Sequence, residues 1–410
     1  MSSAPPSEFR FDPYSDEAMR NPQPLYRILR EHHPAYFIPE YDSWVFTRYE
    51  DVWNGYMDRD HFSESEGMVF PREVLLEHHR GNPPEPVLEP VKNMFLFLDP
   101  PVHTQHRQAT ALPFLKGSIA KREAEITALV QERLALLLPR GEFDLNTDFA
   151  SFVSVTMVCR VLGIEPQDPQ ALADAVNRSV AALNDGPDLD EARAFTYALL
   201  LETVQRRRAG KGTESPVIDA LIHRDTIGRP LTDEEIAVDL NGILVGGTET
   251  LPKIVAGGLL ELARRPDQLA EIRAGMPDSI VPAFEEMLRF NAPAQWFGRT
   301  VKKPVRLGGV DLEPGQRVIL NIASANRDDR EFDQPDEFIW NRKVRRLLSF
   351  GVGPHFCIGI HLARLEGQVM LREFLNAVKR YTVHPERGNW PASQFQIGWT
   401  SLPVTIEELA

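Results

Sequence analysis

The residues best suited to chemistry lie in the segment Phe-Gly-Val-Gly-Pro-His-Phe-Cys-Ile-Gly, which covers residues 350–359. Its glycines, Gly351, Gly353 and Gly359, allow the backbone to turn tightly and to approach a flat group closely. Cys357 comes just before an apolar pattern with helical spacing. Because the N-terminus of a helix stabilises an anion, the pattern predicts a Cys357 thiolate in a metal-ligand loop.

A lone cysteine is more often a small buried hydrophobe than a ligand, so its neighbours must decide. The segment resembles the fingerprint Phe-Gly-x-Gly-x-His-x-Cys-x-Gly of the cytochrome P-450 family of haem-thiolate monooxygenases, and all six fixed positions match. The resemblance implies that Cys357 is the axial ligand of the iron of haem b, a thiolate that favours O–O cleavage. It also implies that Phe350 contacts the haem.

A second candidate group lies within a long helical pattern. Thr232 and Glu235 have the spacing of a capping box, and helical spacing continues from there to Arg265, where Pro266 ends it. About 33 residues at 1.5 Å each would make a rod of roughly 50 Å, long enough to cross a domain.

This helix is expected to be interrupted near its middle. Gly246 and Gly247 weaken it, and Pro252 lacks an N–H and clashes with an earlier carbonyl. The breakers predict a kink that exposes backbone carbonyls and the hydroxyl of Thr250. In the plainer alternative, Thr250 bonds back to its own helix and Glu249 is a solvated carboxylate.

The segment resembles the family's Gly/Ala-Gly-x-Asp/Glu-Thr, in which the acid and the alcohol supply protons for dioxygen activation. The resemblance implies that Glu249 and Thr250 are catalytic and that Gly246 lies against the haem. This sequence has Glu where Asp is the commoner residue.

Further basic residues are placed to bind the haem propionates. His103 and Arg107 follow a Pro-initiated helix start and share one face at i and i+4. They could equally form a solvated basic face. The match to the family's Asp-Pro-Pro-x-His-x-x-x-Arg implies that they bind propionates instead, together with Arg299 and His355.

Glu286 and Arg289, at i and i+3, match the family's Glu-x-x-Arg, a weak motif on its own. The resemblance implies a structural triad with Arg342. The Asp-Pro or Asn-Pro that usually precedes that arginine is absent here.

The 410-residue chain is 42% hydrophobic, which is enough for a sizeable core, and its formal net charge is -14. An acidic chain disfavours nucleic acid and anionic membranes as partners. Two cysteines give no disulfide framework, and we find neither a leader pattern nor an apolar run of the 18 or so residues that would span a bilayer. We therefore expect a soluble, cytoplasmic protein.

Residues 1–24 are Pro-rich and polar and are expected to form an N-terminal arm. Residues 25–410 are expected to form one haem-binding domain. The resemblance extends over about residues 20–405 and implies a fold that is mainly α with small β-sheets (α+β), with a long central helix across the haem. A hairpin is predicted at residues 35–47 and an irregular segment at 63–98. The resemblance also implies a mobile two-helix lid at residues 171–198.

The resemblance implies a monooxygenase that inserts one atom of O2 into an organic substrate. The chain has no flavin, dinucleotide or iron–sulfur motif, so its electrons must come from outside. The resemblance to the family's soluble bacterial members implies that a [2Fe-2S]-type ferredoxin and its NAD(P)H-dependent reductase supply them, and we expect the protein to be a monomer. The basic run Arg342, Lys343, Arg345 and Arg346 could dock that ferredoxin or be merely solvated.

Two other functions remain open at this point. A haem-thiolate sensor would need the loop but not the acid–alcohol helix, and relatives that are peroxide-driven peroxygenases usually replace the acid–alcohol pair.

The substrate is not named by the sequence. The resemblance places Val245, Ala294, Trp296 and Ile397 as apolar walls of its pocket, which favours a small hydrophobic molecule such as a terpenoid or an aromatic compound. Basic residues at 72–80 leave room for a substrate with a carboxylate.

Overall fold

The computed structural model describes residues 9–79, 94–181, 187–225 and 228–410. Most of the chain is helical, and the expected α+β class is confirmed. The helices are α1 Asp16–Arg20, α2 Gln23–His32, α3 Tyr49–Met57, α4 Arg72–His79, α5 Val102–Thr110, α6 Lys116–Ala120, α7 Glu123–Leu137, α8 Ser151–Leu162, α9 Pro169–Ala181, α10 Pro187–Arg208, α11 Pro216–Ile222, α12 Asp233–Thr248, α13 Thr250–Ala263, α14 Pro266–Ala274, α15 Ile280–Phe290, α16 Ile322–Ala325 and α17 Ile360–Ala377.

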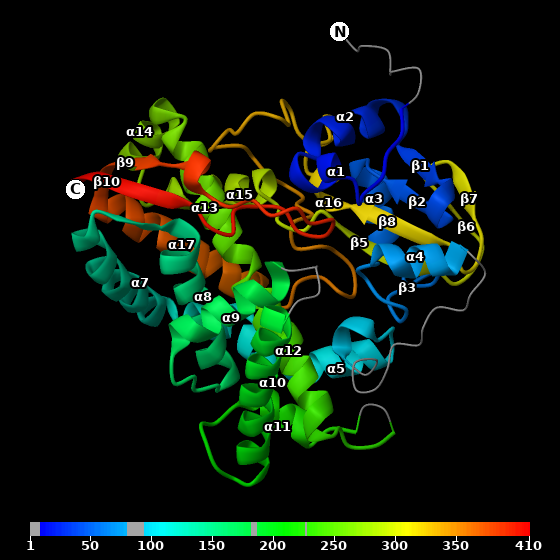
Figure 1. Cartoon of the computed structure of the whole chain (residues 1–410), viewed down its shortest axis with the longest axis horizontal. Helices are drawn as coiled ribbons and strands as arrows, with labels where there is room; N and C mark the ends of the chain where they lie inside the picture. Colours follow the sequence, from blue (N-terminus) through cyan, green and yellow to red (C-terminus); the bar gives the residue numbers. More distant parts are fainter. Residues whose placement is uncertain (1–8, 80–93, 182–186, 226–227) are drawn as a thin grey trace.

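The strands form small sheets at the edge of the helical body. They are β1 Ala35–Ile38, β2 Ser43–Phe46, β3 Phe62–Ser63, β4 Glu142–Asp144, β5 Trp296–Val301, β6 Val305–Leu307, β7 Val310–Leu312, β8 Arg317–Asn321, β9 Val378–Val383 and β10 Pro403–Leu409. The largest sheet has the order β1-β2-β8-β5-β3 and lies to one side of the helices (Figure 1). Within it β2 and β8 are parallel and the other pairs antiparallel. The predicted hairpin is β1–β2.

The predicted long helix is present and is divided in two. Thr232 and Glu235 form the capping box that begins α12, and Pro266 begins the next helix. Glu249, at φ -106° and ψ -33°, separates α12 from α13. The kink therefore lies between Gly246 and Pro252, as predicted. The two halves cross the middle of the molecule (Figure 1).

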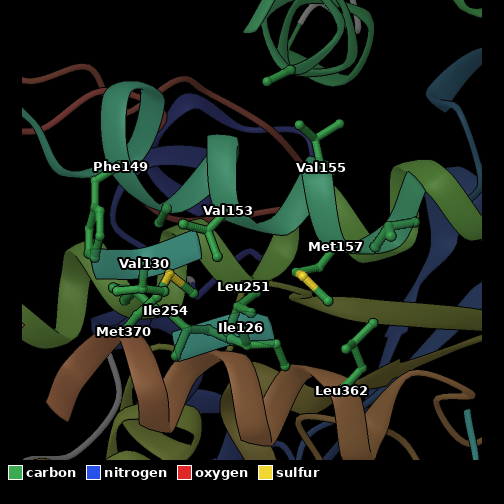
Figure 2. Close-up of a cluster of buried hydrophobic side chains, with 14 of the residues drawn as sticks. Ile126, Val130, Phe149, Val153, Val155, Met157, Leu251, Ile254, Leu362 and Met370 are labelled. Carbon is green, nitrogen blue, oxygen red and sulfur yellow. The ribbon is translucent and has the colours of Figure 1, made fainter. Parts of the chain in front are cut away.

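The largest hydrophobic cluster joins the helix that carries the acid–alcohol pair to the helix that follows the cysteine loop. Leu251 and Ile254 of α13 lie between Met157 of α8 and the side chains Leu362 and Met370 of α17 (Figure 2). All five are at most 4% exposed. Fully burying a side chain of this size contributes about 1.5–3 kcal/mol, so the packing fixes these two helices against each other.

Three sequence expectations need comment. Within the proposed arm, Phe11 and Ala18 are buried in a core cluster rather than laid over the surface, and the division into arm and domain stays a prediction. The irregular segment contains α4, while its residues 80–93 lie outside the described part. Helices α9 and α10 flank the proposed lid turn, which lies mostly within the undescribed residues 182–186.

Two helical segments, Leu145–Leu162 and Asp233–Ala263, are long and apolar enough to cross a membrane. In each, 78% of the most apolar 18-residue window is buried inside the protein, which is what core helices show.

Candidate active site

The cysteine loop is a compact turn that leads into α17. The backbone N–H of Cys357 donates a hydrogen bond to the carbonyl oxygen of Phe350 at 2.8 Å. Gly351 and Gly353 adopt φ +64° and +79°, as the predicted tight turn requires. At Gly353 a Cβ would lie 2.4 Å from a backbone oxygen of α3, so no other residue fits there. Gly359 instead has φ -85° and is the N-cap of α17.

The charge of Cys357 is set by opposing influences. Burial raises the pKa of its thiol, while the N–H of Gly359 and the guanidinium groups of Arg107 and Arg364 lower it. The helix N-terminus alone therefore does not impose the thiolate that the sequence predicts. A metal ion would do so, because coordination deprotonates a thiol outright.

The four expected propionate donors lie in one cluster. His103 and Arg107 come from α5, Arg299 from β5 and His355 from the cysteine loop. The rings of His103 and His355 stack with their centroids 3.8 Å apart. Nη1 of Arg107 donates a hydrogen bond to the carbonyl oxygen of Pro354 at 3.3 Å. The ring nitrogens of both histidines are buried and make no hydrogen bond to any described residue.

Both histidines in this cluster are held neutral. Burial, with Arg107 and His106, lowers the pKa of His103 to about 4. Burial, with His103 and Arg299, lowers the pKa of His355 even further. A neutral imidazole still has one N–H to donate, so two imidazoles and two guanidinium groups face this space with donors for two carboxylates. The donor set fits the propionates of haem b.

Glu64 lies inside the same cluster and was not singled out by the sequence analysis. Its Oε1 is 2.7 Å from Nε of Arg299, and its Oε2 is 3.6 Å from Nε2 of His355. Burial raises the pKa of the Glu64 carboxyl to about 7, although Arg299 lowers it and Asp99 raises it further. Any carboxylate bound by the cluster must therefore share Arg299 with Glu64.

Opposite effects on haem retention are expected from two substitutions in this cluster. Arg107→Ala removes a charge-assisted donor worth about 1.5–3 kcal/mol, so haem should be lost one to two decades faster. Glu64→Gln should slow haem loss, because it removes a negative charge that competes for Arg299. Haem transfer to apomyoglobin measures both, with Glu77→Gln on the exposed side of α4 as control. Equal rates in the four proteins would contradict the assignment.

The kink holds the acid and the alcohol differently. The hydroxyl of Thr250 donates to the carbonyl oxygen of Gly246 at 3.0 Å, so it does bond back to its own helix. Glu249 is buried rather than solvated, and Nζ of Lys253 contacts its Oε1. Its Oε2 makes no hydrogen bond to any residue that the structure describes.

The two glycines of the kink have different roles. A Cβ on Gly247 would lie 2.6 Å from Cγ2 of Val158, so this glycine allows α12 to pack closely on α8. The sequence analysis gave Gly247 no role other than that of a helix breaker. A Cβ on Gly246 would meet nothing within 4 Å, which leaves open space beside the kink for a flat group. Gly246 and the donor cluster together provide the fit expected for haem.

The triad forms as expected, and it includes Arg342. Nε and Nη2 of Arg289 donate to both carboxylate oxygens of Glu286 at 2.8 and 2.7 Å, and Nε of Arg342 lies 3.1–3.2 Å from the same two oxygens. Arg289 also donates to the carbonyl of Asn326, whose side chain bonds to Ser349 just before the cysteine loop. The triad thereby supports the loop that carries Cys357.

The proposed basic patch needs correction. Arg342 donates to the carboxylate of Glu286 in the triad, and Arg346 contacts the carboxylates of Glu50 and Glu331. Only Lys343 and Arg345 of the four remain exposed. The composition of residues 342–346 could not show which of these cations are paired, because their acidic partners lie outside this segment, from 15 to almost 300 residues away.

The four proposed substrate walls do not meet at one described cavity. Val245 lines a cavity of about 510 Å³ between α10 and α12, and Ile397 lines another of about 400 Å³ beside α13. Ala294 is buried and pairs with Gln396 as an isolated bridge. Trp296 is 1% exposed within the hydrophobic cluster under the large sheet, so packing explains it.

Of the residues that sequence reasoning missed, Lys253 carried a usable signal. It follows Glu249 by four residues, which places both on one helix face. Glu64 and Gln396 carried no such signal, since tertiary packing alone brings them to the site.

Comparisons with known proteins all point to one family. The family model described as "Cytochrome P450" matches residues 183–407. "Putative cytochrome P450 123" of Mycobacterium tuberculosis is 31% identical over 410 residues, covering 98% of both chains. "Beta-dihydromenaquinone-9 omega-hydroxylase" of the same organism is 30% identical and covers 97% of this chain and 78% of its own. Cytochrome P450 CYP109Q5 from Chondromyces apiculatus superposes with a TM-score of 0.81 at 26% identity, over 98% of each chain.

Proposed function

The chain belongs to the cytochrome P450 family of haem b monooxygenases, and we propose that Cys357 is the thiolate that binds the haem iron in it. The observation that carries this proposal is the cysteine loop lying beside four donors, from three separate parts of the chain, that suit two propionates; the ring nitrogens of the two histidines among them are buried. When bound, haem b supplies the iron at which O2 is reduced with electrons that come ultimately from NAD(P)H.

The protein's own residues bind the haem and transfer protons towards the site of O2 reduction. His103, Arg107, Arg299 and His355 bind the propionates through charge-assisted and neutral hydrogen bonds. Glu249, buried at the kink, accepts protons and passes them on, and the hydroxyl of Thr250 positions each proton. The hydroxyl oxygen can still accept a hydrogen bond while its O–H is directed to Gly246. The hydrophobic packing of α13 and α17 fixes these groups relative to Cys357.

We propose a small hydrophobic substrate, of terpenoid or aromatic type, that is hydroxylated in the cavity along α10 and α12. Val238, Val245, Ala194 and Tyr197 give that cavity apolar walls, and Arg193, Thr196 and Asn241 add polar groups. The hydroxylase of similar sequence is named for an isoprenoid quinone, which supports the terpenoid class. A carboxylate-bearing substrate has less support, because Arg72 donates to the hydroxyl of Tyr41.

We propose that a [2Fe-2S]-type ferredoxin supplies the electrons on the face of the cysteine loop. A cavity of about 390 Å³ opens there, lined by Met57, Arg345, Phe356 and Arg364 among others. Met57 and Phe356 are exposed, Arg345 lines the same cavity, and Lys343 is an exposed cation two residues before Arg345. This combination suits a small acidic partner. We further propose that the protein acts as a soluble, cytoplasmic monomer, and its two cysteines are both unpaired.

Two measurements test this function. Panels of hydrophobic compounds are added to the ferric protein, and the change in its absorbance spectrum is followed to find a ligand. Oxygen consumption with that ligand should then require both ferredoxin and NAD(P)H. Turnover with hydrogen peroxide alone would support a peroxygenase, and ligand binding without any turnover would support a sensor.

A further inference from the structure

Lys253 is a buried cation on α13 that the acid–alcohol pair does not include. It forms an ion pair with Glu249, and its ammonium donates a hydrogen bond to Oε1 of Gln396 at 2.7 Å. The side chains of Lys253 and Glu249 are only 4% and 3% exposed. Buried ion pairs are often no more stabilising than apolar residues of similar size, so stability does not by itself account for this one.

The turn before the last strand holds Lys253 in place. Gly398 has φ +129°, and a Cβ there would lie 2.9 Å from the Cβ of Lys253. Gln396, two residues earlier, accepts the hydrogen bond from the ammonium and pairs with Ala294 as an isolated bridge. The lysine is therefore held by its helix on one side and by this turn on the other.

A cavity of about 400 Å³ runs along the same face of α13. From this helix it is lined by Lys253, Gly257, Leu260, Glu261 and Arg264, the spacing of a single helix face. Eleven residues at 1.5 Å each separate its ends by about 16 Å. At the outer end the side chain of Arg264 is 54% exposed, whereas Lys253 at the inner end is buried. The cavity thus leads from the surface to the partner of Glu249.

The cavity wall also carries buried polar atoms without protein partners. Nδ2 of Asn291, Nε of Arg327 and Nε1 of Trp390 make no hydrogen bond to any described residue, and all three residues line the cavity. Polar atoms of this kind around a space of this size are suited to bind water. Charged groups at Arg20, Glu261 and Arg264 extend the polar lining outward.

We propose that Lys253 is the positioning residue through which protons from this cavity reach Glu249. The inference rests on the proposed function and adds a proton supply to it. Oε1 of Glu249 faces Lys253, and Oε2, free of described partners, is left to pass a proton onward. Starting from this ion pair, an N–H bond of the Lys253 ammonium breaks as an O–H bond forms on the Glu249 carboxylate, and that O–H bond breaks in turn when the carboxyl passes its proton onward. The amine then regains a proton from cavity water, which regains it from bulk solvent.

The link can be tested without turnover, by infrared spectroscopy of the ferric holoenzyme at neutral pH. In Lys253→Met the carboxylate of Glu249 loses its cation in a buried site and should bind a proton. A carboxylic acid band should then appear that is absent from the wild type and from Lys253→Arg. It should vanish in Lys253→Met/Glu249→Gln, which assigns it. A Lys253→Met spectrum identical to the wild type would overturn the link.

Turnover measurements test whether Lys253 speeds proton delivery to Glu249. With a ligand, ferredoxin, reductase and O2 present, Lys253→Met should slow NAD(P)H consumption by about tenfold or more, as loss of a proton-transfer partner does. Lys253→Arg should restore most of the rate, and Lys211→Met, at an exposed lysine of the α10–α11 loop, should leave it unchanged. Adding Lys253→Met to Glu249→Gln should cause no further slowing, because the lysine acts through that carboxyl.

The double variant removes both charges, so it remains informative if Lys253→Met alone does not fold. Independent, additive slowing by the two substitutions would overturn the proposal, as would a wild-type rate in Lys253→Met. If the wild type itself consumes no O2 with any ferredoxin, the proposed function fails, while the infrared comparison still decides whether Lys253 controls Glu249.

Discussion

Replacing Thr250 by alanine should convert most of the reducing power that the enzyme consumes into hydrogen peroxide rather than hydroxylated product. The hydroxyl lies one turn after Gly246, at the open side of the kink, next to the buried carboxyl of Glu249. Without it, protons still arrive but are no longer positioned, so reduced oxygen leaves as peroxide. NAD(P)H consumption should stay comparable to wild type. The measurement is peroxide formed per NAD(P)H consumed, with a ligand and a surrogate ferredoxin.

The chain offers a matched control on the same helix. The hydroxyl of Thr248 likewise donates a hydrogen bond to a carbonyl oxygen of the preceding turn, that of Leu244, at 2.8 Å. Unlike Thr250, however, Thr248 is buried. Thr248→Ala should therefore retain coupling, and Thr250→Ser should restore much of it. Glu249→Gln should instead slow the whole cycle, because proton supply itself is impaired. Tight coupling in Thr250→Ala would mean that the kink serves substrate shape and that another group positions the proton.

A second large effect is expected on stability, from Glu286→Gln. The substitution keeps the size of a side chain that is 0% exposed but removes the charge shared by Arg289 and Arg342. Breaking a buried ion pair on one side costs about 3–5 kcal/mol. The thermal midpoint of the holoenzyme should fall by several degrees, and haem loss should accelerate because the triad supports the cysteine loop.

Glu285, next to Glu286 in the sequence, is the control for this effect on stability. Glu285 pairs with Arg364 at a partly exposed site, where an ion pair contributes about 0–1 kcal/mol. Glu285→Gln should thus shift the thermal midpoint little. Equal shifts for the two substitutions would show that Glu286 is no more than another helix-surface carboxylate.

The parts of this site that could be predicted from the sequence are those fixed by local physics. The capping box at Thr232, the interruption between Gly246 and Pro252 and the positive φ angles of the cysteine loop all depend on neighbouring residues. Family resemblance added the donors His103, Arg107, Arg299 and His355, which the fold then brings together from three segments.

What could not be predicted depends on contacts between distant segments. Glu64 comes to Arg299 only because β3 pairs with β5 in the sheet. Arg346 is neutralised by Glu50, almost 300 residues earlier, which removed it from the expected patch. Trp296 was placed in the pocket by the family resemblance, but it is buried in a core cluster, and an apolar residue type suits both places equally.

The central claim, that Cys357 binds haem iron as a thiolate, is tested most directly by the absorbance spectrum of the ferrous carbon monoxide complex. The wild type should show the red-shifted band that a thiolate ligand produces. Cys357→His should keep haem in a fraction of molecules, held by the propionate donors, yet lose that band. A red-shifted band that persists in Cys357→His would contradict the assignment, since another side chain would then have to be the ligand.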